Sequence, residues 1–397
     1  MEALAESQVE KIAKRQALAA PFLAERTAAL PWYLQAALLG STSIAIGLLW
    51  DISWHATIGR DTFWTPAHMA IYLGGLLAGL SSGLLALKTT FSGTDGERAA
   101  SVRFWGFRAP LGAWVVIWGA FAMLTSAPFD DWWHNAYGLD VKIISPPHMV
   151  LAAGMIAIQL GTQLLAVAWA NRGAAAAKPR LTLAFTYASG ILLVFLVTML
   201  IEYSTPGRQH TAFFYKISLG VYPLALLAVA RGARLRWGAT WAALSYTAFS
   251  LAATWILPLF PARPLLAPIY NPVTHMWPIP FPLLLILPAV GIDLLVRRLG
   301  TEREWRLAWA AAAMFLAVFF LAQWFFAEFM LSPHSRNWFF ASDQWPYYSH
   351  LGSWRYEFRD VDVSPVTPLA LGIALLLGAG SARLGLLWGR FLGRVQR

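Results

Sequence analysis

Long apolar stretches, each bounded by polar or helix-breaking residues, dominate the pattern along this chain. About ten of them have the length of roughly 20 residues that crosses a bilayer as an α-helix. They cover residues 33–54, 66–88, 109–130, 147–170, 182–203, 213–230, 239–260, 277–296, 307–330 and 366–388. Leu and Ala prevail within them, and Pro, Gly or charge clusters separate them, which predicts helices. The expected fold class is an all-α polytopic membrane protein built from repeated helix–loop–helix pairs.

Composition supports the same interpretation. Of the 397 residues, 58% are hydrophobic and 13% are charged, whereas soluble domains have about 45–50% and about 25%. Such a chain cannot cover itself with a water-compatible surface, which excludes soluble enzymes, secreted disulfide scaffolds and disordered proteins. The chain contains no Cys, so any metal ion must bind to His, Asp, Glu or Met.

The net charge of +10 comes from one side of the expected bilayer. With the N-terminus inside, the segments on the cytoplasmic side hold 22 of the 30 Lys and Arg residues. This bias predicts that both termini lie in the cytoplasm, and we expect the bacterial inner membrane as the location. The basic excess therefore marks topology in a lipid bilayer and predicts no nucleic-acid partner.

Four regions follow from these spans. Residues 1–30 are a cytoplasmic segment, either an amphipathic surface helix or a plain helical tail. Residues 31–171 form a module of two repeats, and residues 172–306 form a second module with weaker repeats. Residues 307–397 hold two spans joined by a large aromatic outer loop, 331–365, which is a lid, a partner-binding loop or an ordinary interfacial loop.

The histidines reveal the repeat in the first module. All eight lie at outer ends of spans or in outer loops: His55, His68, His134, His148, His210, His275, His334 and His350. The stretches 51–69 and 130–149 align, with one inserted residue, in Asp, Trp-His, Gly, Asp, Pro and His-Met. Self-similarity of this kind predicts a duplicated helix–loop–helix module.

The spacing within each repeat brings ligands together. Asp51 and His55 lie one helical turn apart on one face, and Pro66 starts the next helix with His68 in its first turn. The second repeat places its residues in the same way: Asp130, His134 and His148. One carboxylate and two imidazoles suit copper, iron(II) or zinc.

Two further acids and two tryptophans are candidates for a supporting role around the metal sites. Asp61 and Asp140 occupy matching positions and either accept a hydrogen bond from a ligand imidazole or cap a loop, while Trp54 and Trp133 would shield the sites from water. The alternative for the whole set is that His and Asp cap helix ends in the headgroup layer. Two triads with one spacing favour metal sites, because ionisable residues at membrane depth are costly and usually functional.

The repeats resemble a known family. The stretch Asp51-x-x-Trp54-His55-x-Thr57-Ile58-x-Arg60-Asp61-Thr62-x-x-Thr65-Pro66-x-His68 is similar to the metal motif of the C subunit of particulate methane and ammonia monooxygenases. The second motif of that subunit resembles Asp130-Asp131-Trp132-x-His134 followed by Pro146-x-His148, although the family has Asn where this chain has Asp130. The resemblance spans about residues 33–170. It implies a copper site in each repeat, quinol as electron donor, partner subunits and an oligomer.

The function expected is therefore a copper-dependent monooxygenase-like protein that oxidises a small apolar substrate or ammonia with O₂. Iron and zinc remain alternative metals. A non-catalytic, periplasm-facing copper-binding or acquisition protein is the second hypothesis, and a structural subunit of a larger membrane complex is the third. Glu202, His210 and His275 form a candidate third site, for which capping of helix ends is the favoured interpretation.

Overall fold

Long helices account for most of the structure, a computed structural model that describes residues 30–59, 62–138, 145–172, 178–232, 235–349 and 364–397. Nine helices in these ranges are long and apolar enough to cross a membrane, which supports the all-α, multi-pass expectation. They are α2 (Trp32–Thr57), α3 (Pro66–Phe91), α5 (Leu111–Tyr137), α6 (Pro146–Asn171), α7 (Lys178–Met199), α8 (Ala212–Gly232), α9 (Gly238–Ile256), α11 (Glu304–Leu331) and α12 (Pro368–Leu392). The expected segment 1–30 lies almost wholly outside the described residues.

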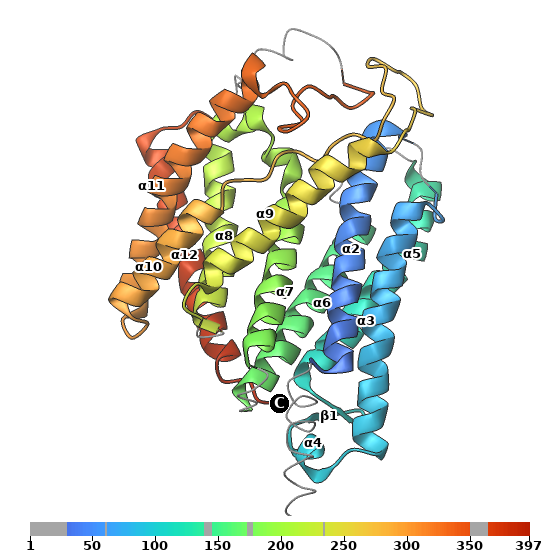
Figure 1. Ribbon diagram of the computed structural model, residues 1–397, viewed down its shortest axis with the longest axis vertical. Coiled ribbons are helices and arrows are strands. Elements are labelled where there is room, and N and C mark those ends of the chain that lie inside the picture. The colour runs from blue at the N-terminus through green and yellow to red at the C-terminus, as the bar shows by residue number, and fades with distance from the viewer. Residues whose placement is uncertain (1–29, 60–61, 139–144, 173–177, 233–234, 350–363) are drawn as a thin grey trace, which may run out of the picture.

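The helices form two groups joined by α7 (Figure 1). In the first group α2 packs on α3 and α5 packs on α6, as the repeat predicted. In the second, α8 packs on α12, which also contacts α11. We call the end of the molecule that carries Asp51 and Asp130 the outer end, and the opposite end the inner end.

The predicted span 277–296 is wrong as a continuous helix. Its helix, α10 (Ile286–Leu299), has 14 residues and a length of about 21 Å, short of the roughly 30 Å of a bilayer core. Three prolines (Pro278, Pro280 and Pro282) precede it, and each lacks the N–H that a helix needs. Residues 277–285 therefore form an irregular, non-helical segment that contacts the neighbouring helices.

Side chains replace the missing helical hydrogen bonds of this segment. Leu283 N–H donates to Tyr246 Oη at 2.9 Å, and Leu284 N–H donates to Gln323 Oε1 at 3.0 Å. Thr254 Oγ1 donates to the Ile279 carbonyl at 3.0 Å. Irregular backbone is tolerated at membrane depth where protein groups satisfy it, and these three side chains lie on α9 and α11.

Short elements complete the chain and were not expected from the hydrophobic pattern. The inner connection between α3 and α5 holds α4 (Asp95–Ala99) and a hairpin of β1 (Val102–Phe104) and β2 (Phe107–Ala109), seen at the lower end of Figure 1. The strands are antiparallel, with Val102 opposite Ala109. The 3₁₀ turns η2 (Ile201–Tyr203), η3 (Pro206–His210), η4 (Leu257–Leu259) and η5 (Pro333–Ser335) lie in the outer connections.

Glycine contacts set the spacing of the paired helices in both repeats. A Cβ atom at Gly40 would lie 2.6 Å from the Gly74 carbonyl oxygen, and one at Gly119 would lie 2.8 Å from that of Gly154. Gly40 and Gly119 each precede the first Asp of their repeat's triad by 11 residues, and Gly74 and Gly154 each follow the second His by 6. The duplication therefore includes the helix crossing that holds the outer ends together.

Candidate metal sites

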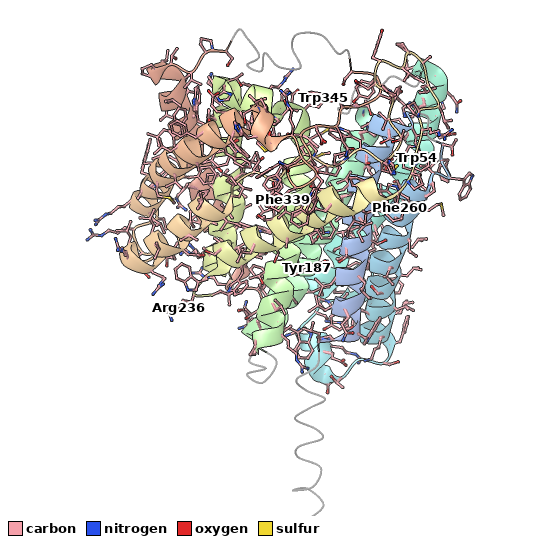
Figure 2. All side chains as sticks on the ribbon, turned by 45° about the horizontal axis from the view of Figure 1, so that its top comes forward. Trp54, Tyr187, Arg236, Phe260, Phe339 and Trp345 are labelled. Atoms are coloured by element: carbon pink, nitrogen blue, oxygen red, sulfur yellow. The ribbon has the colours of Figure 1, made fainter. Side chains whose placement is uncertain are left out.

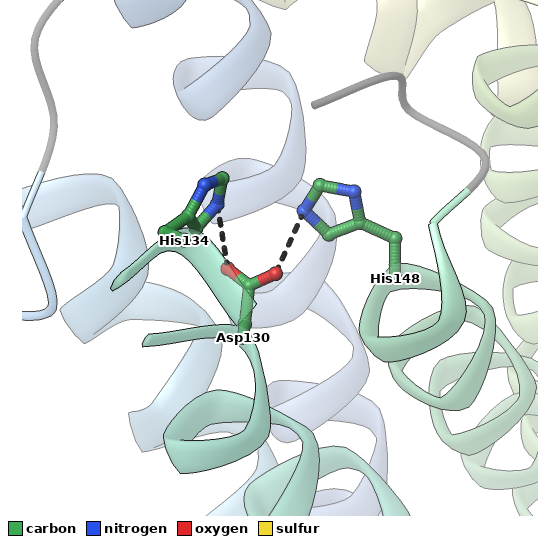
Figure 3. Close-up of side chains that lie close together, drawn as sticks. All are labelled: Asp130, His134 and His148. Carbon is green, nitrogen blue, oxygen red and sulfur yellow. Dashed lines mark ion pairs between the residues drawn. The ribbon is translucent and has the colours of Figure 1, made fainter. Parts of the chain in front are cut away.

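The outer ends of α5 and α6 bring Asp130, His134 and His148 together (Figure 3). His134 Nε2 lies 3.3 Å from Asp130 Oδ2, and His148 Nε2 lies 3.4 Å from Asp130 Oδ1. One ligand atom from each residue lies within 4.8 Å of the other two. Among the residues that the structure describes, this is the one group of three His, Asp or Glu residues with that property.

The first repeat has the same arrangement in a wider form. His68 Nε2 lies 3.1 Å from Asp51 Oδ1, and His55 Nε2 lies 3.8 Å from Asp51 Oδ2. The His55 side chain is 48% exposed, whereas that of His134 in the second repeat is 18% exposed. The first set is therefore open to solvent at His55, whereas His68 at 17% is less exposed than His148 at 29%.

A backbone carbonyl fixes one imidazole in each set. His68 Nδ1 lies 2.9 Å from the Thr62 carbonyl oxygen, and His134 Nδ1 lies 3.2 Å from that of Gly138. A carbonyl oxygen only accepts hydrogen bonds, so Nδ1 of each ring carries the proton. In a neutral ring Nε2 is then an acceptor that faces a carboxylate oxygen, which is another acceptor.

Two acceptors this close need a positive charge between them. Either a proton lies between them, carried by the imidazole or by the carboxyl group, or a metal ion lies between nitrogen and oxygen. Two ligand atoms that are each about 2.0–2.2 Å from one ion in tetrahedral geometry lie about 3.4 Å apart, which matches both separations in the second set. In the first set the His68 contact of 3.1 Å is close to this value, whereas the His55 contact of 3.8 Å is wider. One oxygen of each carboxylate, Asp51 Oδ1 and Asp130 Oδ1, is also buried without a hydrogen bond from any described residue. The donor set therefore fits a copper, iron or zinc ion.

Local sequence explains why these carbonyls are in place. Gly138 ends α5 with φ at +99°, a conformation that favours glycine. Thr62 is held by Thr65, whose Oγ1 donates to its carbonyl at 2.8 Å and accepts from its N–H at 2.8 Å. Ser145 caps α6 by accepting from His148 N–H at 3.4 Å.

Loops from the second half of the chain form hydrogen bonds to the outer end of α2. Tyr347 N–H donates to the Ala56 carbonyl at 3.1 Å and Leu265 N–H donates to the Ile58 carbonyl at 2.9 Å. Trp277 N–H donates to Thr57 Oγ1 at 2.7 Å. The first two bonds satisfy carbonyls that a helix end leaves unpaired. Figure 2 shows Trp54 and Trp345 toward this outer end and Arg236 toward the inner end.

The remaining predicted residues have different outcomes. Asp61 and Asp140 lie outside the described residues, so their role stays a prediction. Trp54 and Trp133 are half-buried on the helices that carry the ligands. The Trp133 ring packs on Tyr137, with the ring centroids 4.5 Å apart.

The candidate third site comprises three residues for which capping of helix ends is the favoured interpretation. His210 Nε2 lies 3.6 Å from Glu328 Oε1, and its ring meets Trp324 edge-on at 4.5 Å. His275 hydrogen-bonds through Nδ1 to Thr274 Oγ1 at 3.0 Å. Within the described part of the chain, Glu202, His210 and His275 do not form a group with ligand atoms within 4.8 Å of one another.

The sequence analysis did not predict two kinds of group that contact the histidines, an acidic side chain and backbone carbonyls. Glu328, the acid beside His210, was visible as the single acid between Trp305 and Leu331. The carbonyls of Thr62 and Gly138 carry no side-chain signature, although a glycine that ends a helix in both repeats was a signal.

Comparison with family models, with curated proteins and with solved structures finds no match to this chain. The resemblance to the monooxygenase C subunit therefore rests on the two motifs and their spacing.

Proposed function

We propose that this protein is a metal-binding membrane protein of the copper-dependent monooxygenase type. One ion would be held by Asp51, His55 and His68, and another by Asp130, His134 and His148. The observation that carries the proposal is the twofold occurrence of a carboxylate facing two imidazoles, one of which has its Nδ1 proton fixed by a backbone carbonyl.

The residues of the chain contribute orientation and charge. The carbonyls of Thr62 and Gly138 aim Nε2 of His68 and His134 at the carboxylates, and such partners raise the basicity of a ligand. Asp130 adds negative charge to the second set. Bound copper would supply the activation of O₂ needed to oxidise a small apolar substrate or ammonia. The same proposal includes quinol as the electron donor and an oligomer with partner subunits. It places the protein in the bacterial inner membrane, with the sites facing the periplasm.

Metal analysis of the full chain in lipid nanodiscs tests the proposal. We expect copper to bind in preference to iron and zinc, His134→Ala to lose the ion of the second set, and His55→Ala to weaken only the first. His334→Ala is the matched control because His334 is exposed on η5, away from both sets. The proposal fails if the wild type and both variants retain the same trace of metal.

A non-catalytic role in copper acquisition or delivery is the second candidate. The observation that favours it is the exposure of His55, which leaves the first set open to a soluble partner at the outer end. Oxygen consumption with quinol and a short alkane or ammonia separates the two functions. An enzyme consumes oxygen only when substrate is present, whereas a carrier transfers its ion to a soluble chelator without consuming oxygen.

A further inference from the structure

Three arginines surround one buried carboxylate at the inner ends of α8, α11 and α12. Glu304 lies in the first turn of α11 and is 8% exposed. Arg231 Nη1 donates to Glu304 Oε1 at 2.6 Å. Arg390 also pairs with Oε1, and Arg383 pairs with Oε2. We call these four residues the Glu304 cluster.

Positive charge exceeds negative charge in this cluster. Glu304 neutralises one of the three guanidinium groups, and the other acid whose charge acts on Arg231 is Glu302. Each guanidinium has five N–H donors, and Nε of Arg390 is buried without a hydrogen-bond partner in the described part of the chain. A partly buried surplus of positive charge is costly unless an anion offsets it.

The surroundings indicate that this anion belongs to a lipid. The guanidinium of Arg383 lies 5.5 Å over the ring of Trp305, which is itself exposed. Exposed tryptophans at helix ends lie at the level of lipid headgroups, and Trp309 is exposed one turn further along α11. Leu384 and Leu387, exposed on α12 beside the arginines, offer an apolar surface to acyl chains.

We propose that the Glu304 cluster binds the phosphate of an anionic phospholipid. Arg383 and Arg390 are 21% and 37% exposed, so they can direct N–H donors that Glu304 does not use toward a headgroup. Glu304 is a positioning residue that holds the guanidiniums in place before the lipid arrives. The helix ends of α8, α11 and α12 are thereby joined to the surrounding leaflet by one ionic network, independently of the metal sites.

The test compares phospholipids on the purified, delipidated full chain in a neutral detergent. Thermal unfolding followed by tryptophan fluorescence should shift upward with phosphatidylglycerol, and native mass spectrometry should show the lipid bound. Phosphatidylcholine and inorganic phosphate should give no comparable shift. Arg390→Gln should weaken the apparent affinity for phosphatidylglycerol about fivefold, which corresponds to about 1 kcal/mol for one arginine near an anionic surface.

Matched variants separate lipid binding from a purely structural clamp. Arg394→Gln removes an exposed arginine one turn beyond Arg390 and should leave the affinity unchanged. Glu304→Gln should weaken the binding of phosphatidylglycerol although the positive charge increases, because the guanidiniums lose the carboxylate that positions them. Equal losses of Tm for Arg390→Gln in phosphatidylcholine and phosphatidylglycerol would show a clamp and overturn the proposal. Equal protection by inorganic phosphate would also overturn it, because the site would then take the free anion.

Discussion

In His68 and His134 the ring proton on Nδ1 determines which nitrogen can act as a ligand. Because a carbonyl accepts from Nδ1, Nε2 of each ring faces the carboxylate, and it presents a lone pair there whenever the ring is neutral. The backbone of Thr62 and Gly138 is therefore as much part of each set as the side chains are.

Gly138→Ala should lower the metal affinity of the second set. Gly138 has φ +99° and ψ 167°, a conformation essentially restricted to glycine that costs another residue about 1–3 kcal/mol, and relief of that strain displaces the carbonyl that orients His134. Gly106→Ala is the control, because Gly106 also has positive φ, at +86°, and a Cβ at either position meets open space. Both variants should lose similar Tm, but only Gly138→Ala should weaken metal binding in titration. Equal metal affinities in the two variants would contradict the role of the carbonyl.

The candidate ligands could be predicted because their spacing is local. Asp130 and His134 lie one turn apart on any helix, and a proline two residues before His148 places that residue in a first turn. The pairing of His210 with Glu328 could not be predicted in the same way. These residues are 118 positions apart in the sequence, and only the packing of η3 on α11 brings them together.

At the scale of elements, the helix pair is the unit that builds a site. Close approach at Gly119 and Gly154 lets α5 and α6 meet along their backbones, so that the outer ends converge on one carboxylate. Gly40 and Gly74 do the same for α2 and α3. Small residues at helix contacts are the means by which membrane helices pack closely.

Gly119→Ala should separate α5 from α6. The added Cβ would lie 2.8 Å from the Gly154 carbonyl oxygen and 2.9 Å from the backbone nitrogen of Ile158, and overpacking of this kind costs about 1–3 kcal/mol. We expect a lower Tm together with weaker metal binding by the second set. Gly83→Ala, where a Cβ meets open space on α3, should change neither. A Gly119→Ala variant with unchanged metal affinity would show that the crossing does not position the ligands.

The short helix α4 should respond to acid. Thr94 N–H donates to Glu97 Oε2 at 2.8 Å, and this bond holds the pKa of the Glu97 carboxyl below its ordinary value. The bond therefore stabilises α4 above the ordinary pKa of about 4.3, and its contribution is lost as the pH falls through the lowered pKa. The protection of the Thr94 amide from exchange, measured relative to its intrinsic rate at each pH, should fall below that pH in the wild type. Glu97→Gln should abolish the dependence on pH, and a dependence that persists would contradict this cause.

The hydrophobic pattern predicted the long helices. It was wrong for one stretch, where an apolar composition occurs together with prolines that prevent a helix. The stretch 277–296 is as apolar as its neighbours, but its prolines exclude a helix before Ile286. The prolines were visible in the sequence, whereas the side chains that satisfy the irregular backbone come from α9 and α11 and were not. The hairpin of β1 and β2 was missed because it is too short to give a periodic signal.

At the scale of the whole molecule, the two halves of the chain meet at the first metal set. Asn271 is central to this contact, because its side-chain amide donates to the carbonyls of Pro346 at 2.8 Å and Ser349 at 2.7 Å. Tyr347, between those two residues, binds the end of α2. The second half thus supports the set that the sequence pattern assigned wholly to the first module.

Asn271→Ala should weaken metal binding by the first set and leave the second unchanged. The variant removes two hydrogen bonds, each of which typically contributes about 0.5–1.5 kcal/mol. Asn171→Ala is the control, since Asn171 donates to the carbonyls of Leu392 and Val395 at 2.9 and 2.8 Å at the inner end. Both variants should lose Tm, and titration with copper should distinguish them. If Asn271→Ala and Asn171→Ala weaken copper binding by the first set equally, the weaker binding follows from the lower stability of the fold alone.

The irregular segment 277–285 affects the order in which parts of the chain can enter the membrane during synthesis. The ribosome makes this segment before α11, so Gln323 does not yet exist when the Leu284 N–H first needs an acceptor. Hydrocarbon offers none, and an unsatisfied backbone group there costs several kcal/mol. We therefore expect the segment to stay in water or in the insertion machinery until α11 is complete. Gln323 also donates to Gln209 at 2.7 Å, so the arrival of α11 locks η3 in the same step.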